Sequence, residues 1–132
     1  MANYYATSRT NTFQVKDVAA FKAWADKLGI RVHQREGGSG FVLDPGDCND
    51  SGTFPSCDIE KDEEIDFADQ LSGHLAEGSV AVIIEAGAEK LRYVHGHAVA
   101  VNSKGEEVHV DLADIYERAE KAFGGEVSRA EY

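Results

Sequence analysis

The chain has 132 residues, and its 13 lysines and arginines against 24 aspartates and glutamates give a formal net charge of −11. A domain of this length can bury a core without a metal or disulfide, and the 42% hydrophobic content excludes a disordered chain. The charge repels nucleic acid and anionic lipid, so basic proteins are the expected partners and direct nucleic-acid binding is not expected. Plain solubility is the alternative explanation of the charge.

The location follows from the absence of targeting signals. No apolar run approaches the roughly 20 residues that span a bilayer, and the first residues lack the pattern of a signal peptide. We therefore expect no membrane segment and a cytoplasmic location, where Cys48 and Cys57 would be reduced thiols. In an oxidising compartment the same two cysteines would close one short loop.

The first predicted elements are a strand and a helix. Residues 10–15 alternate as a strand does. Asp17 is placed to cap a helix over residues 18–28, which Gly29 should end. The apolar residues of this helix recur at helical spacing: Val18, Phe21, Trp24, Ala25 and Leu28.

The middle of the chain predicts a hairpin, a long loop and a second helix. Residues 30–34 and 40–43 read as two strands of a hairpin. Residues 44–65 form an irregular acidic loop that is rich in Asp, Gly, Ser and Pro. Asp66 should cap the second helix, and Gly78 should end it.

The last part predicts three strands, at residues 79–85, 91–102 and 107–111, followed by a helix capped by Asp111. A two-residue turn at 104–105 would place four valines on one face of the sheet: Val99, Val101, Val108 and Val110. The opposite face would be flat enough for a helix or a second surface to approach closely, because its residues are small: Gly96, Ala98 and Ala100. The final helix should bury one stripe: Leu112, Ile115, Ala119, Ala122 and Phe123.

Together these elements run in the order β-α-β-β-(acidic loop)-α-β-β-β-α. Strands joined by hairpins, with helices at intervals, predict one α+β domain over residues 1–132. Its sheet should be mainly antiparallel, with about five to six strands and three helices.

Acidic side chains concentrate between residues 44 and 69, where Lys61 is the only basic residue. Like charges so close together repel, so folding gains nothing from them. Their carboxylates can follow the spacing of nucleic-acid phosphates, and we expect them to bind the basic groove of a partner. The predicted contacts lie in this segment and on the last helix: Asp58, Glu60, Asp62, Glu63, Glu64, Asp66, Asp69, Asp114, Glu117 and Glu120. A solvated loop leading into a helix start is the alternative.

The sequence contains two candidate metal sites, although we expect no cofactor. A partial calcium-loop pattern runs through the acidic loop: Asp47, Asn49, Ser51, Gly52 and Asp58. A final Asp in place of Glu, and Pro55 inside the loop, argue against this site. His95 and His97 share a strand face and could ligate zinc with Glu85 or Asp111, whereas the predicted turn places His109 on the other face.

The opening sequence Met-Ala-Asn-Tyr-Tyr-Ala-Thr-Ser-Arg-Thr-Asn-Thr-Phe-Gln-Val-Lys-Asp resembles that of small uncharacterised acidic proteins of bacteriophages and conjugative elements. Residues 80–101 resemble them too, with the core Glu-Ala-Gly-Ala-Glu-Lys-Leu-Arg-Tyr. The resemblance implies an inhibitor of host defence, because some anti-restriction and anti-CRISPR proteins are acidic DNA mimics. The leading hypothesis is therefore a non-enzymatic inhibitor of a basic, nucleic-acid-handling host protein.

Two further functions stay open. One is a metal-dependent hydrolase or transferase that uses His95, His97 and Glu85, although no catalytic sequence motif supports it. The other is a structural or regulatory module that forms a homodimer through an exposed sheet edge.

Overall fold

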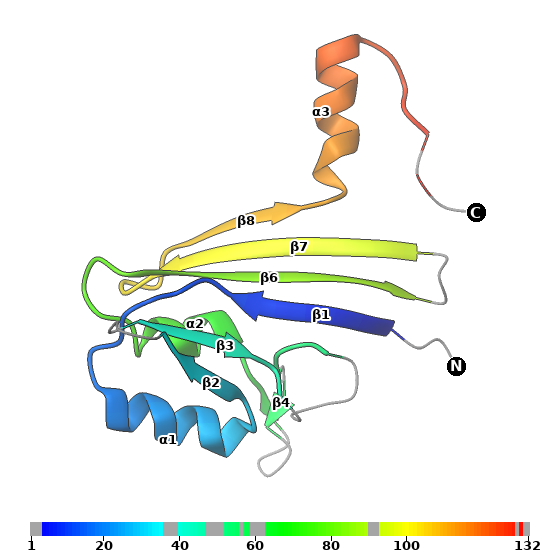
Figure 1. Ribbon diagram of the computed structural model, residues 1–132. Coiled ribbons are helices and arrows are strands. Elements are labelled where there is room, and N and C mark those ends of the chain that lie inside the picture. The colour runs from blue at the N-terminus through cyan, green and yellow to red at the C-terminus, as the bar shows by residue number, and fades with distance from the viewer. Residues whose placement is uncertain are drawn as a thin grey trace.

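The structure is a computed structural model that describes residues 4–35, 40–46, 52–55, 57–58, 63–89, 93–128 and 130. Its centre is a four-stranded antiparallel sheet with the strand order β1-β6-β7-β8 (Figure 1). The strands are β1 (Tyr4–Thr10), β6 (Val80–Glu89), β7 (Tyr93–Asn102) and β8 (Glu107–Asp111). Three helices accompany the sheet in the described residues, so the predicted α+β class and element order are confirmed.

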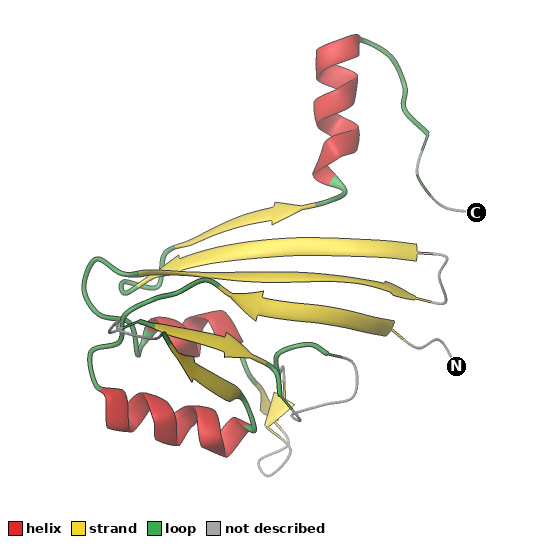
Figure 2. Cartoon of the chain, in the orientation of Figure 1, coloured by secondary structure: helices red, strands yellow, loops and turns green. Residues whose placement is uncertain are grey.

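The remaining elements lie on two sides of this sheet (Figure 2). The inner side carries α1 (Val18–Leu28), α2 (Phe67–Ser72) and the hairpin of β2 (Arg31–Gln34) and β3 (Phe41–Asp44). α3 (Asp114–Phe123) stands on the opposite, outer side. Within the acidic segment, β4 (Cys57–Asp58) pairs with β5 (Glu63–Glu64). None of the described helices is long and apolar enough to cross a bilayer.

α1 begins and ends where its sequence requires. The Asp17 carboxylate accepts a hydrogen bond from Ala20 N–H at 3.1 Å, which satisfies a backbone donor at the helix start. Gly29 ends the helix with φ of +76°, a conformation that glycine adopts without a side-chain clash. Both predicted caps are therefore confirmed.

The core lies between the inner face of the sheet and the layer formed by α1, α2 and β3. Phe21 is fully buried at its centre, with its ring centroid 5.7 Å from that of Phe13 and 5.4 Å from that of Phe41. Trp24 joins the two inner helices, because its indole Nε1 donates to Gln70 Oε1 at 2.9 Å. The sheet contributes four buried side chains from β6 and β7: Ala81, Ile83, Val99 and Val101.

The first strand lies earlier than residues 10–15, the range that the sequence predicts. β1 runs from Tyr4 to Thr10, and residues 13 and 15 make only single bridges, Phe13 to Phe41 and Val15 to Leu75. The inward positions of β1 include the buried polar residues Ser8 and Thr10. Because these positions are not apolar, the strand shows no hydrophobic alternation, and its pairing with β6 is what defines it.

The second helix is shorter than predicted. α2 is capped by Asp66 as expected, but it ends at Ser72 and not at Gly78. The backbone beyond it pairs with the chain before α1: Lys16 N–H donates to His74 O at 3.0 Å, and Ala76 N–H donates to Gln14 O at 2.9 Å. These tertiary hydrogen bonds replace the ones that would continue the helix.

The β7–β8 register differs by one residue from the predicted one. The turn spans three residues, 103–105: Asn102 N–H donates to Glu106 O, and Val101 pairs with Glu107. A one-residue shift moves every side chain of a strand to the other face. Val108 and Val110 therefore lie opposite Ala100 and Ala98 on the outer face. His109 lies opposite Val99 on the inner face.

The last helix does not bury its predicted stripe. No residue of α3 is buried, and Ile115 and Phe123 are 60% and 86% exposed. Asp111 is also not its N-cap residue, because the cap position is Ala113. The Asp111 carboxylate instead accepts from Ala113 N–H at 2.8 Å, just before the helix begins.

Candidate functional site: an acidic cleft

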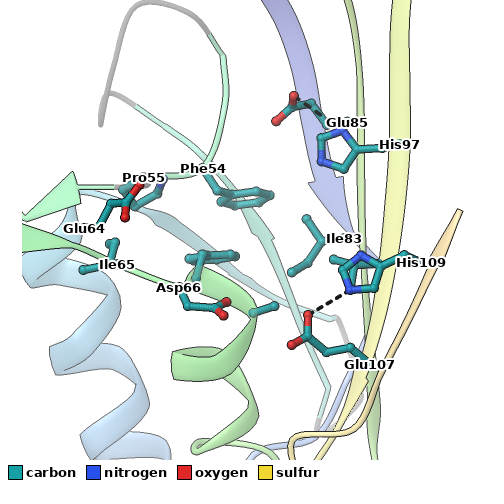
Figure 3. A pocket seen from close by; sticks show the side chains of 13 residues that line it. Phe54, Pro55, Glu64, Ile65, Asp66, Ile83, Glu85, His97, Glu107 and His109 are labelled. Atoms are coloured by element: carbon teal, nitrogen blue, oxygen red, sulfur yellow. Dashed lines mark ion pairs between the residues drawn. The ribbon is translucent and has the colours of Figure 1, made fainter. Parts of the chain in front are cut away.

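A cleft of about 660 Å³ opens between the inner face of the sheet and the segment that leads into α2 (Figure 3). One wall comes from β6, β7 and β8, and the other comes from residues 54–55 and 64–68. The lining residues are Phe54, Pro55, Glu64, Ile65, Asp66, Phe67, Ala68, Ile83, Glu85, His97, Val99, Glu107 and His109.

The sheet wall carries two histidine–carboxylate pairs. Glu85 and His97 are partners in the β6–β7 register, and His97 Nδ1 lies 3.9 Å from Glu85 Oε2. His109 and Glu107 sit two residues apart on β8, so alternation places both on the inner face. Their side chains meet with Nε2 3.3 Å from Oε1 (Figure 3). The register shift described above brings the second pair beside the first.

The opposite wall contains both apolar and acidic residues. The rings of Phe54 and Phe67 stack with centroids 4.6 Å apart, and both residues are buried. Glu64 and Asp66 flank them and are exposed. Asp66 also caps α2, since its Oδ1 accepts a hydrogen bond from Asp69 N–H at 3.1 Å. Its negative charge therefore also stabilises the start of the helix.

The cleft is strongly negative. Four carboxylates line it, those of Glu64, Asp66, Glu85 and Glu107, and the described lining residues include no lysine or arginine. Apolar side chains lie between these charges. Lysine and arginine have an apolar stem and a cationic head, so this combination fits one of their side chains from another molecule.

The structure separates the predicted contact residues into two groups. Glu64, Asp66 and Asp69 are exposed on the inner side, and Asp58 and Glu63 pair across β4 and β5. Glu60 and Asp62 lie outside the described residues. The other predicted contacts, Asp114, Glu117 and Glu120, belong to α3. This helix stands on the outer side of the sheet (Figure 1). Glu117 forms a 3.0 Å ion pair with Lys121.

Asp44, at the start of the acidic segment, is held by its own chain. Its carboxylate contacts His33 Nε2 and accepts from Gly46 N–H at 2.8 Å, and Arg31 Nε lies 3.9 Å away. Partial burial alone would raise the pKa of Asp44, but the hydrogen bonds from His33 and Gly46 and the charge of Arg31 together lower it. This carboxylate therefore stabilises the β2–β3 hairpin.

The predicted calcium loop falls largely on residues outside the description, which include Asp47, Asn49 and Ser51; of Asp58 only its place in β4 is described. Gly52 lies within the description and has a packing reason to be glycine. Its φ is +79°, and a Cβ there would lie 1.9 Å from the carbonyl oxygen of Ala6.

The predicted zinc ligands are only partly brought together. His95 and His97 share the inner face of β7, and Glu85 faces His97, but His95 is absent from the described lining of the cleft. Across the described part of the chain, no three His, Cys, Asp or Glu side chains gather in a group that could hold a metal ion.

Sequence reasoning missed Glu107 and His109 as cleft residues. A signal was present in the turn sequence Asn102-Ser-Lys-Gly-Glu106. A three-residue hairpin loop commonly ends with a glycine at positive φ, and Gly105 has φ of +83°. Reading that loop as three residues would have placed both side chains on the inner face.

Comparisons with known proteins supply no further assignment. A scan against protein-family models, a search of curated proteins and a search of solved structures each found no match. The geometry and charge of the cleft are therefore the features that bear on function.

Proposed function

We propose that this protein is a non-enzymatic binding protein that inhibits a basic, nucleic-acid-handling protein of a bacterial host, and that it acts in the host cytoplasm. The observation that carries the proposal is the cleft, which is lined by four carboxylates and, in its described lining, by no lysine or arginine. A lysine or arginine side chain of the partner would place its stem against Phe54 and Ile83 and its cationic head among the carboxylates.

The exposed carboxylates beside the cleft support a partner that normally binds nucleic acid. Glu64, Asp66 and Asp69 extend the negative surface from the cleft along the start of α2. A basic groove that binds phosphates through several lysines and arginines would meet several carboxylates on this one side. Such a contact competes directly with nucleic acid and depends on salt, as nucleic-acid binding does.

The first test uses two variants with the same change in net charge. The cleft variant carries Glu64→Gln, Glu85→Gln and Glu107→Gln, and it keeps Asp66 because that residue caps α2. The control carries the equivalent changes on α3: Asp114→Asn, Glu117→Gln and Glu120→Gln. Calorimetry with an oligoarginine peptide should show affinity lowered about tenfold or more by the cleft variant, and changed by less than about threefold by the control.

The second test identifies the partner. Tagged wild-type protein and both variants should be used to capture proteins from a bacterial lysate. We expect a basic nucleic-acid-binding protein that the wild type and the α3 control retain and the cleft variant loses. Added protein should also displace that partner from its nucleic acid. Capture that is equal for all three baits would refute the cleft as the contact surface.

The metal-dependent hydrolase or transferase stays a prediction. The structure adds Glu107 and His109 to the wall that holds Glu85 and His97, and histidine–carboxylate pairs are common in proton transfer. Metal analysis of the purified protein is the direct test, because a stoichiometric transition metal that is lost with His97→Ala would favour this function over the one proposed above.

A further inference from the structure

The outer face of the four-stranded sheet is open and is apolar over β6, β7 and β8, whereas β1 adds Thr7 and Arg9 at one edge. Its outward positions on β6, β7 and β8 hold only Val, Ile, Ala and Gly, apart from Asn102, in a chain of which 28% of residues are charged. Five large side chains on this face are 48 to 72% exposed: Tyr5, Ile84, Val94, Val108 and Val110. None of the described helices lies over it (Figure 1).

α3 is the second uncovered element on this side. Ile115, Ala119 and Phe123 recur at helical spacing along one stripe, and charged residues occupy most of the other positions. Such a helix ordinarily packs its stripe against a sheet or another helix. Here Ile115 and Phe123 are mostly exposed.

The connection between β8 and α3 explains why these two surfaces do not meet within one chain. Leu112 is fixed to the sheet, since its N–H donates to Gly96 O at 2.8 Å and its side chain covers the space where a Cβ of Gly96 would lie. Ala113 alone separates Leu112 from the helix. Two further hydrogen bonds direct the chain away from the sheet, from Ala113 N–H to the Asp111 carboxylate and from Asp111 N–H to the Asp114 carboxylate.

We propose that a second copy of this chain covers this side, with α3 of each copy lying across the outer face of the other. In a dimer with a two-fold axis, α3 of each copy covers the outer face of the other copy, so both apolar surfaces of each chain are buried. The small residues Ala98 and Ala100 allow a helix to approach closely. The interface is face to face, and so differs from pairing through the sheet edges.

The area and the charge both fit a dimer. From their exposed fractions, the five side chains with Leu112, Ile115 and Phe123 present on the order of 1,000 Å² of surface. A stable interface needs about 800 Å² from each partner, whereas the largest apolar patch of a monomer is usually about 300–600 Å². The outward positions of β6 to β8 carry no charge, so two acidic chains can meet there while their clefts face away from each other.

The test is the mass of the protein in solution, measured by sedimentation equilibrium over a range of concentrations. Wild type should have twice the 14.3 kDa of one chain. Val108→Glu places a charge within the interface and should raise the dimer dissociation constant at least about tenfold. Phe123→Ser should act in the same direction, and it cannot disrupt the core because the side chain is 86% exposed.

The matched control is Val18→Glu, which adds the same charge at an exposed position of α1 on the inner side. This variant should remain a dimer. A wild type that stays monomeric at all concentrations overturns the proposal, because another partner must then cover the face. A dimer that tolerates both Val108→Glu and Phe123→Ser also overturns it, because the association then uses another surface. Neither result bears on the cleft, which oligoarginine binding tests separately.

Discussion

His74 lies where the aromatic side chains of the two inner helices meet. Its ring centroid is 4.9 Å from that of Trp24 and 6.1 Å from that of Phe21. Burial lowers the pKa of His74 below 6.5, the nearby Lys16 lowers it further, and Asp17 partly opposes both effects. The folded protein therefore favours the neutral imidazole.

This shift predicts an acid-dependent loss of stability. The unfolded chain takes up the proton near pH 6.5 and the folded chain takes it up at lower pH, so the contribution is complete above pH 6.5 and is lost as the pH falls below it. Urea unfolding measured over that range should show the decline for wild type and a smaller decline for His74→Phe. An unchanged decline in the variant would show that another group is responsible. The stabilisation from Asp44, whose pKa is lowered from 3.8, is complete above pH 3.8 and is lost only as the pH falls below that value.

Most residue-level features that depend on the local chain were predictable, although the cap predicted at Asp111 was wrong. The caps at Asp17, Gly29 and Asp66 follow from short-range rules, because a capping side chain reaches only two or three residues along the backbone. The cleft could not be assembled in this way. Glu64 reaches the same cleft as His109 only through the packing of α2 on the sheet.

At the scale of the element, the packing of α1 against the rest of the protein depends mainly on one side chain, that of Phe21. Phe21 joins the helix to Phe13 and Phe41, packs beside Trp24 of the same helix, and is fully buried. Phe21→Ala should lower the free energy of unfolding by about 3–5 kcal/mol, since it removes the ring and leaves a cavity. Denaturant unfolding would measure this, with Phe21→Leu as a control that refills most of the space and should cost less. A loss below about 1 kcal/mol for the alanine variant would mean that the site collapses to fill the cavity.

The mispredicted elements are those whose position no periodic pattern in the sequence determines. β1, the end of α2 and the β7–β8 register are each decided by a distant partner or by one residue of turn length, and neither has a periodic signal in the sequence. β6 and β7 were located within a few residues because their apolar runs are long, and β8 was located by the turn that precedes it. Thus the strands were predictable, whereas the face on which the β8 side chains lie was not.

For the whole molecule, the sheet separates two surfaces of different chemistry. The inner side carries the acidic cleft (Figure 3), and the outer side carries the apolar face. α3 also stands on the outer side (Figure 1). In the proposed dimer both clefts face outward, so two linked cationic sites on a partner could be bound at once, with higher avidity than either alone.

This separation predicts opposite responses to salt. Sodium chloride should weaken oligoarginine binding, because it screens the attraction between the peptide and the cleft. The same salt should leave self-association intact or strengthen it, because two chains that each carry a charge of −11 repel less when screened. Calorimetry and sedimentation over one series of salt concentrations would measure both. Two constants that weaken together would contradict the assignment of an apolar interface and an ionic cleft.

The pairing of β1 with β6 has a consequence for how the chain is made. A ribosome produces residues 4–10 early, but the partner residues 83–89 come much later. Contacts between segments so far apart in sequence form slowly, because a long loop must close first. β1 must therefore remain without its native neighbour until β6 has been made. The β6–β7 hairpin, whose strands are close in sequence, is the natural template onto which β1 later docks.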